Sequence, residues 1–299
     1  MKESKKELRG SIVPLVTPFR NGSLDEAALA ALIEWQIQSG SHGISVTGTT
    51  GEPTALTRAE RERVIQLTAQ VIKGRLPFVA GTGSNNFDET LHFTRFAQKA
   101  GADAVLVITP YYVRPSQEGL YQHFKRIADS VEIPLILYNI PSRSAVNLEI
   151  DTVERLRENC KNIVGIKEAN HDFSHITRLL GKLGRDFLVY SGIELLCFPV
   201  LAIGGAGHVS ATANILPKEV ARLYDLVLEG KWREAQDLHY HLMPLNDAVF
   251  IEINPVPVKT ALGMMKRISP EVRPPLAPLS EENRRKLRAV LDRYGLVRP

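Results

Sequence analysis

The chain has few features of a secreted, membrane-bound or disulfide-built protein. It has only two cysteines, Cys160 and Cys197, in 299 residues, which excludes a disulfide framework and is typical of a reducing cytoplasm. No run of about eighteen apolar residues occurs, so no transmembrane helix is expected. The N-terminal sequence MKESKKELRG is charged and has no apolar core, unlike a secretory signal. We therefore expect a cytoplasmic protein that does not bind membranes.

Clusters of charge of one sign are also absent. The formal net charge is +4, but the charged residues lie in mixed runs such as RAERER (58–63) and EENRRKLR (281–288), which are typical of solvated helix faces. This distribution argues against nucleic-acid binding. A mild positive charge favours small anionic ligands instead.

The sequence does contain a regular alternation of apolar runs and amphipathic stretches. Hydrophobic residues make up 44% of it and charged residues 23%, as in ordinary globular proteins. Amphipathic helices are expected, for example, at residues 25–40, 58–74, 86–101 and 217–230. Strands are expected at residues 11–19, 42–48, 77–83, 104–110, 134–141, 162–169, 187–192 and 207–214. Eight strand–helix units of about thirty residues each predict an α/β fold, a (β/α)8 TIM barrel.

An open doubly wound sheet is the alternative fold for this alternation. Such a sheet carries a glycine-rich fingerprint after its first strand, whereas the first strand here continues into TPFRNGSLDE. The barrel is therefore favoured, and we expect residues 1–230 to form it and to carry the active site. Residues 231–299 are too few for an independent domain, so they are expected to add C-terminal helices packed on the barrel or on another subunit.

A lysine stands inside one of the predicted strands, NIVGIKEAN (162–170). The two-residue period of a strand places Lys167 on one face with Ile163, Gly165 and Ala169, and Glu168 on the other with Val164 and Ile166. Burial favours the neutral amine of a lysine, which attacks ketone or aldehyde carbonyls and forms an imine. The alternatives are that Lys167 pairs with Glu168 or reaches solvent from a shorter strand.

Other polar side chains stand where barrel strands end, which is where barrel enzymes have their active sites. Tyr138 ends the neighbouring strand and is a candidate proton shuttle; otherwise it is a core aromatic. Thr49 and Thr50, in GTTGE, offer hydroxyls and backbone N–H groups, or simply form a turn. Arg143 suits a bidentate carboxylate, unless it is an ordinary surface arginine.

Five motifs, which keep their order and spacing along the chain, closely resemble a known enzyme group. They are GTTGE (48–52), TPYYVRPSQEGLYQHF (109–124), YNIPSR (138–143), GIKEA (165–169) and VSATAN (209–214). The group is that of the dihydrodipicolinate synthases, within the dihydrodipicolinate synthase and N-acetylneuraminate lyase superfamily of class I, pyruvate-dependent aldolases. The resemblance runs from about Gly10 to the end of the chain.

The resemblance implies a role for each of these residues. Lys167 would form a Schiff base with pyruvate, and Tyr138 would exchange protons through Thr50 with Tyr112, which reaches across a tight dimer interface into the neighbouring site. Thr49 and Thr50 would bind the pyruvate carboxylate through their N–H groups, with Gly192 and Val209 lining the pocket. Arg143 would bind the carboxylate of L-aspartate 4-semialdehyde, and the product would be 4-hydroxy-tetrahydrodipicolinate, on the path to lysine. Homotetramers (dimers of dimers) or homodimers would be expected.

The sequence departs from the synthase pattern at the second substrate's side of the site. Ser144 and Ala145 stand where the group has threonine and glycine, and Ile193 and Glu194 stand where it has two aspartates. These changes leave two alternatives open. One is a related pyruvate aldolase that acts on another aldehyde or 2-keto acid, of the 4-hydroxy-2-oxoglutarate or keto-deoxy sugar acid type. The other is a non-catalytic barrel that binds a keto acid.

A possible allosteric site is also implied by the resemblance. Lysine-inhibited relatives bind free lysine in a cleft at the dimer interface, where this chain has Asn85, Glu89 and Tyr111. Arg58 and Arg61 stand where many inhibited enzymes have histidines, and Pro53 replaces a small polar residue. Because like charges repel, the two arginines disfavour a cationic ligand, unless they pair with Glu60 or Glu62. We expect weak or absent lysine inhibition.

A metal-dependent mechanism is the remaining alternative. His171 and His175 have the i, i+4 spacing of metal ligands on a helix, but no third ligand is apparent nearby. We therefore expect them to be polar residues of a helix surface. Neither a metal nor an organic cofactor is expected, because the lysine and its neighbours supply the chemistry.

Overall fold

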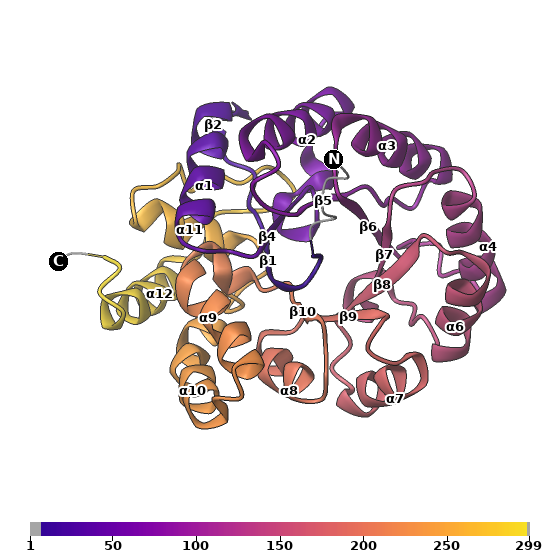
Figure 1. The fold of residues 1–299 in the computed structure, drawn as a ribbon. Coiled ribbons are helices and arrows are strands. Elements are labelled where there is room, and N and C mark those ends of the chain that lie inside the picture. The colour runs from indigo at the N-terminus through magenta and orange to yellow at the C-terminus, as the bar shows by residue number, and fades with distance from the viewer. Residues whose placement is uncertain (1–6, 298–299) are drawn as a thin grey trace.

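Eight parallel strands form a closed barrel at the centre of the molecule (Figure 1). The computed structural model describes residues 7–297 and pairs the strands in the order β1-β10-β9-β8-β7-β6-β5-β4, with β4 pairing back to β1. The strands are β1 (Gly10–Pro14), β4 (Gly43–Val46), β5 (Phe78–Gly81), β6 (Ala104–Ile108), β7 (Leu135–Asn139), β8 (Ile163–Glu168), β9 (Leu188–Ser191) and β10 (Gly207–His208). The predicted TIM barrel is confirmed. A short hairpin, β2 (Phe19–Arg20) and β3 (Ser23–Leu24), follows β1.

A ring of helices surrounds the barrel (Figure 1). Side chains cap the N-termini of several of them, including α2, where Thr57 accepts from the backbone N–H of Glu60 at 3.3 Å and the Glu60 carboxylate accepts from that of Thr57 at 2.9 Å. The helices are α1 (Glu26–Gln38), α2 (Arg58–Ile72), α3 (Phe87–Ala100), α4 (Gln117–Ala128), α5 (Pro141–Ser144), α6 (Ile150–Asn159), α7 (Phe173–Leu183), α8 (Cys197–Ala202) and α9 (Pro217–Leu228).

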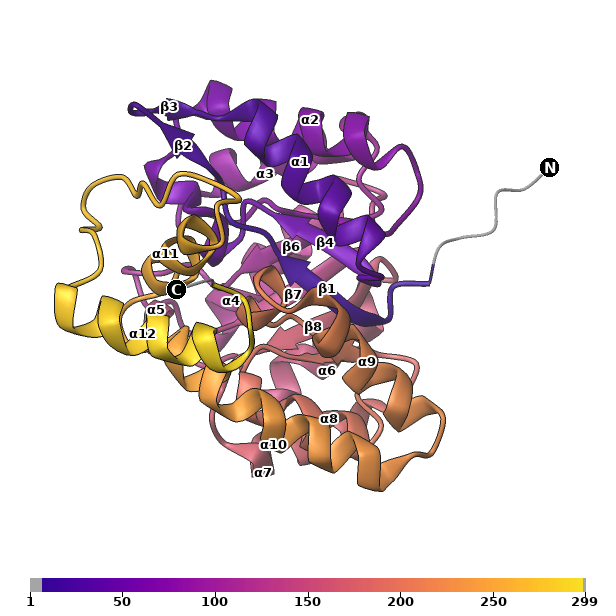
Figure 2. The same ribbon diagram turned by 90° about the vertical axis from the view of Figure 1, so that its left-hand side faces the viewer.

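Three further helices follow the barrel: α10 (Trp232–Ala248), α11 (Val256–Met264) and α12 (Glu281–Arg293). Figure 2 shows them along one side of the barrel, with α11 near the β2–β3 hairpin. The expected C-terminal helices are therefore present, while the division of the chain into two units at residue 230 stays a prediction. None of the helices in residues 7–297 is long and apolar enough to cross a membrane.

A β-bulge in β8 changes which side chains face the barrel interior. The register of β7 with β8 shifts between Leu135 and Ile136, so that Leu135 pairs with Ile163 but Ile136 with Gly165. Ile163 consequently packs in the outer core, between strands and helices, and Val164 packs against the inner core. The predicted faces of these two residues were wrong because a bulge interrupts the two-residue period.

A buried ion pair joins α11 to the loop after β4. Lys259 Nζ lies 2.6 Å from Glu52 Oε1, and the two side chains are 0% and 2% exposed. The same ammonium lies 4.1 Å from the ring centroid of Phe19, and the guanidinium of Arg273 lies 4.2 Å from it. Arg273 also forms an ion pair with Glu60 at 2.6 Å. These contacts hold the C-terminal segment against the GTTGE loop.

We expect Lys259→Met to lower the free energy of unfolding by about 3–5 kcal/mol, because Glu52 then stays buried without its partner. The double variant Glu52→Gln, Lys259→Met removes both charges and should recover most of this loss. Urea denaturation measures both. Lys286→Met is the control, since Lys286 pairs with Glu282 on the surface and should change the free energy by about 1 kcal/mol or less. A Lys259→Met protein as stable as this control would contradict the prediction.

Candidate active site

A cavity of about 470 Å³ opens at the carboxyl ends of the barrel strands. Such a position is where barrel enzymes place their catalytic residues. The cavity is lined by all but one of the residues predicted for catalysis and substrate binding: Thr49, Thr50, Tyr138, Arg143, Lys167, Gly192 and Val209. The exception is Tyr112. The structure thus brings together residues from five separate segments of the chain.

Lys167 projects from the inner face of β8 and is 6% exposed. Its Nζ lies 4.1 Å from the ring centroid of Tyr138, because the two residues pair directly across β7 and β8. A Cβ atom at position 192 would lie 2.9 Å from the Lys167 Cε, so Gly192 leaves room for the lysine side chain. Lys167 is therefore a buried amine held against a phenol.

The two threonines of GTTGE face different partners. The Thr49 hydroxyl lies 3.3 Å from the Tyr138 hydroxyl, whereas the Thr50 hydroxyl accepts a hydrogen bond from Asn254 Nδ2 at 3.0 Å. The prediction that Thr50 contacts Tyr138 was therefore wrong. Residues Thr49–Gly51 form a 3₁₀ turn, in which successive side chains point about 120° apart, so only one of the two hydroxyls reaches Tyr138.

Arg143 lies on the short helix α5, immediately after β7. Its Nη2 donates to the backbone carbonyl of Asn254 at 3.3 Å. Asn254 thus contacts both Arg143 and Thr50, although sequence reasoning gave it no role. The guanidinium of Arg143 forms the cavity wall at this point. It carries the positive charge that a substrate carboxylate would need.

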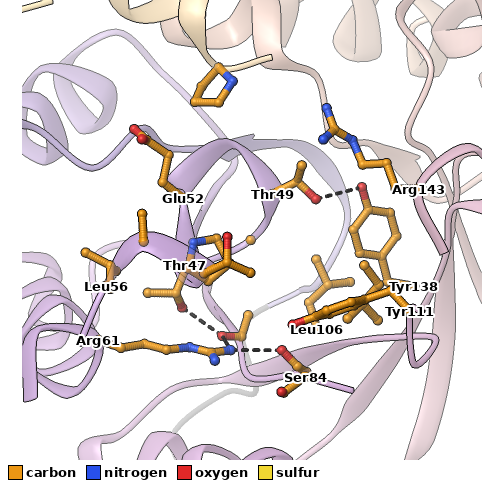
Figure 3. Close-up of a pocket in the computed structure, with 18 of the residues that line it drawn as sticks. Thr47, Thr49, Glu52, Leu56, Arg61, Ser84, Leu106, Tyr111, Tyr138 and Arg143 are labelled. Carbon is orange, nitrogen blue, oxygen red and sulfur yellow. Dashed lines mark hydrogen bonds between the residues drawn. The ribbon is translucent and has the colours of Figure 1, made fainter. Parts of the chain in front are cut away.

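A second cavity, of about 510 Å³, shares part of this wall (Figure 3). Thr49, Tyr138, Arg143 and Asn254 line both cavities. The residues predicted for an allosteric site, Asn85, Glu89 and Tyr111, line the second one together with Arg61. These residues therefore lie beside the lysine cavity and not within it.

Arg61 is buried in the wall of the second cavity. Its Nη2 donates to the carbonyls of Gly81 and Gly83 at 3.0 and 3.1 Å, and its guanidinium lies 4.1 Å from the Phe93 ring centroid. Burial lowers the pKa of Arg61 to about 10, so it remains a cation at neutral pH. Of the two arginines, it is Arg58 that lies near Glu62, at 3.5 Å.

Tyr112 lies outside both cavities. Its side chain is 88% exposed, and its backbone has φ 73°, the left-handed region that non-glycine residues rarely adopt. Tyr112 therefore contributes nothing to the site of its own chain.

A carboxylate closes another part of the lysine cavity. Glu194 is 7% exposed, and its Oε1 accepts from the backbone N–H of Ala211 at 2.7 Å. Burial raises the pKa of Glu194 to about 7, against the lowering effects of that hydrogen bond and of Lys167. The residue that departs from the synthase pattern here is thus an acid that titrates near neutrality.

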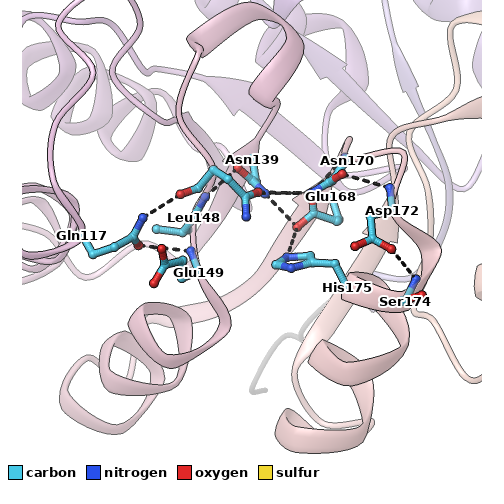
Figure 4. Close-up of polar contacts among 10 residues, drawn as sticks. Gln117, Asn139, Leu148, Glu149, Glu168, Asn170, Asp172, Ser174 and His175 are labelled. Atoms are coloured by element: carbon cyan, nitrogen blue, oxygen red, sulfur yellow. Dashed lines mark hydrogen bonds and ion pairs between the residues drawn. The ribbon is translucent and has the colours of Figure 1, made fainter.

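Behind the lysine, a polar network occupies the outer faces of β7 and β8 (Figure 4). Glu168 accepts from Asn139 Nδ2 at 2.9 Å and lies 3.4 Å from His175 Nε2. Glu168 therefore does not pair with Lys167, which excludes that alternative for the lysine. The prediction for His175 was wrong, because its side chain is only 11% exposed and contacts this carboxylate. His171 lines the lysine cavity instead, from the loop before α7.

Comparison with known proteins places the whole chain in one group. The family model described as the dihydrodipicolinate synthetase family matches residues 7–294. The 4-hydroxy-tetrahydrodipicolinate synthase of Thermus thermophilus is 48% identical over 290 residues, which are 97% of each chain.

Two solved structures have the same fold. Dihydrodipicolinate synthase from Aquifex aeolicus superposes with a TM-score of 0.95 and 45% identity, over 97% of this chain and 99% of that one. The enzyme from Cyanidioschyzon merolae, solved with lysine bound, gives a TM-score of 0.94 and 33% identity, over 98% of this chain and 100% of that one. From the match to the family model and from these identities, the chain belongs to the dihydrodipicolinate synthetase family.

Proposed function

We propose that this protein is a Schiff-base lyase that condenses pyruvate with L-aspartate 4-semialdehyde to 4-hydroxy-tetrahydrodipicolinate. The observation that carries the proposal is the buried amine of Lys167 against Tyr138, at the mouth of a barrel whose relatives bear this enzyme's name. The product is a precursor of lysine and diaminopimelate.

The first half-reaction uses Lys167 and Tyr138. The amine attacks the C2 carbonyl of pyruvate, water leaves, and a C=N bond replaces the C=O bond. Tyr138 supplies the proton that the departing oxygen needs, and Thr49, 3.3 Å from it, passes protons to and from the tyrosine. The iminium then withdraws electrons from C3, which loses a proton and becomes the enamine nucleophile.

The second half-reaction joins the aldehyde. Enamine C3 attacks the aldehyde carbon, forming the new C–C bond, and the aldehyde oxygen takes up a proton. The amino group of the second substrate then displaces the lysine from the imine carbon, which closes the ring and frees Lys167. Arg143 binds the carboxylate of this substrate, and the N–H groups of Thr49 and Thr50 bind that of pyruvate, in a pocket lined by Gly192 and Val209.

Tyr112 completes a neighbouring subunit's site in this proposal. A tyrosine that is 88% exposed and has a strained backbone is explained if a second chain covers it. The protein would then be a homodimer or a dimer of dimers. We also propose that it works in the cytoplasm.

The proposal is tested with pyruvate and borohydride. Reduction should attach one pyruvate to Lys167, identified by peptide mass spectrometry, and Lys167→Ala should abolish both adduct and turnover. Lys161→Ala, which removes an exposed lysine beside the same strand, is the control and should keep both. Adduct formation followed by product only with an aldehyde other than aspartate semialdehyde would contradict the proposed second substrate. Absence of any adduct would contradict the mechanism.

The two threonines should differ in their effect on rate. Thr49→Val removes the hydroxyl beside Tyr138 and should lower kcat by about 10²-fold, at the lower end of general acid–base effects. Thr50→Val should lower it by less than about 10-fold, because that hydroxyl contacts Asn254 and the backbone N–H remains. Thr49→Ser keeps the hydroxyl and should stay near the native rate. Steady-state kinetics at saturating pyruvate measure all three, and the reverse order of Thr49→Val and Thr50→Val would refute the assignment.

Lysine should inhibit this enzyme weakly. The buried guanidinium of Arg61 lines the cavity with Asn85, Glu89 and Tyr111 and repels a cationic side chain, so half-inhibition should need more than about 1 mM L-lysine. Arg61→His removes most of this charge at neutral pH and should lower that concentration, whereas Arg58→His, at an exposed position, should not. Half-inhibition of the native enzyme by sub-millimolar lysine would contradict this account of the cavity.

A further inference from the structure

The two reacting side chains each have a polar neighbour on the opposite face of the same strand. In the register of β7 with β8, Tyr138 pairs with Lys167 and Asn139 pairs with Glu168. Side chains alternate along a strand, so Tyr138 and Lys167 face the cavity while Asn139 and Glu168 face the helices. Each outer side chain is therefore separated from an inner one by a single peptide unit.

The outer pair is held by direct hydrogen bonds (Figure 4). Asn139 Nδ2 donates to Glu168 Oε1 at 2.9 Å and to Oε2 at 3.0 Å, and both residues are 0% exposed. Asn139 Oδ1 accepts from the backbone N–H of Leu148 at 3.0 Å. The amide therefore has a fixed orientation, with its donor toward the carboxylate.

Neighbouring groups compensate the carboxylate and extend its contacts to two loops. The backbone N–H of Asn170 donates to Glu168 Oε1 at 2.9 Å, and His175 Nε2 lies 3.4 Å from Glu168 Oε2. The hydrogen bond to the Glu168 carboxylate raises the pKa of His175. The side-chain amides of Asn139 and Asn170 both donate to Asn147 Oδ1, at 2.8 and 3.2 Å. The network thus joins the loop after β7 to the loop after β8.

Stability alone does not explain a buried carboxylate at this level. Two residues earlier on each strand, on the same outer faces, Leu137 pairs with Ile166, and both pack in the outer core. An apolar pair of this kind is commonly as stable as a buried polar one or more so. The directional bonds of Asn139 and Glu168 supply what apolar contacts lack, which is a fixed side-chain orientation at the last paired residues of β7 and β8.

We propose that Asn139 and Glu168 are positioning residues, which hold the Tyr138 hydroxyl and the Lys167 amine at a fixed separation for imine formation. The inference rests on the proposed function, since it assumes that Lys167 reacts with pyruvate. Neither residue touches the cavity, so each acts through the adjacent catalytic side chain.

The test replaces the hydrogen bond by a repulsion and then restores it. Asn139→Asp places two carboxylates face to face and should lower the maximal rate of pyruvate-adduct formation about 10²-fold, as expected when reacting groups move by about 1 Å. The concentration of pyruvate giving half that rate should stay nearly unchanged, because the N–H groups of Thr49 and Thr50 lie on another loop. Adding Glu168→Gln gives the carboxylate at 139 a donor again and should recover at least about 10-fold.

Asn162→Ala is the matched control for stability. Asn162 immediately precedes β8, at the end opposite Glu168. Its Nδ2 donates to the carbonyls of Ala128 and Val131 at 3.0 and 2.9 Å. Its loss should lower the melting temperature without slowing adduct formation. If Asn139→Asp does not fold, Asn139→Ala replaces it, with the same expected direction.

The outcomes separate the inference from the proposed function. The native protein is assayed first, and its failure to form an adduct would refute the function itself. With a reactive native protein, three results would overturn the inference. These are a folded Asn139 variant that reacts at the native rate, a double variant no faster than Asn139→Asp, and an equal slowing by Asn162→Ala.

Discussion

The register between β7 and β8 is the constraint on which the site depends. It places Tyr138 beside Lys167, and a closed barrel leaves this register little freedom because each strand is also paired on its other edge. The bulge at the start of β8 lets Val164 pack against the inner core while Lys167 keeps its place opposite the tyrosine. A shift by one residue would point the lysine at the helices and Glu168 into the cavity.

The charged side chains around Tyr138 and Lys167 lie in three places: behind the strands, within the cavity and at its mouth. Glu168 is directed outward, where Asn139, Asn170 and His175 contact its carboxylate, so it forms no ion pair with the lysine. Within the cavity, the acid is Glu194, whose burial raises its pKa to about 7. At the mouth, Arg143 provides a cation. An anionic keto acid thus meets a cationic rim and a buried amine.

The sequence predicted the architecture well because its signals are local. Apolar runs and amphipathic stretches located the strands and helices, and the two-residue period placed Lys167 and Glu168 on opposite faces of their strand. The assignments that failed depend on geometry that no local pattern carries. A 3₁₀ turn decided that Thr49 and not Thr50 meets Tyr138, and a bulge exchanged the faces of Ile163 and Val164. Contacts between distant segments, such as Lys259 with Glu52 and Asn254 with Thr50, had no signal at all. The only sequence feature that connected Asn139 with the site was its position next to Tyr138.

The most direct measurement of the central claim is a crystal structure of the protein soaked with pyruvate. The account predicts continuous electron density from Lys167 Nζ to C2 of the keto acid. It also predicts the Tyr138 hydroxyl within hydrogen-bonding distance of the reacting centre, and the pyruvate carboxylate on the N–H groups of Thr49 and Thr50. Pyruvate bound without a bond to Lys167, or bound covalently with Tyr138 turned away from it, would contradict the claim that the β7–β8 register builds the reactive pair.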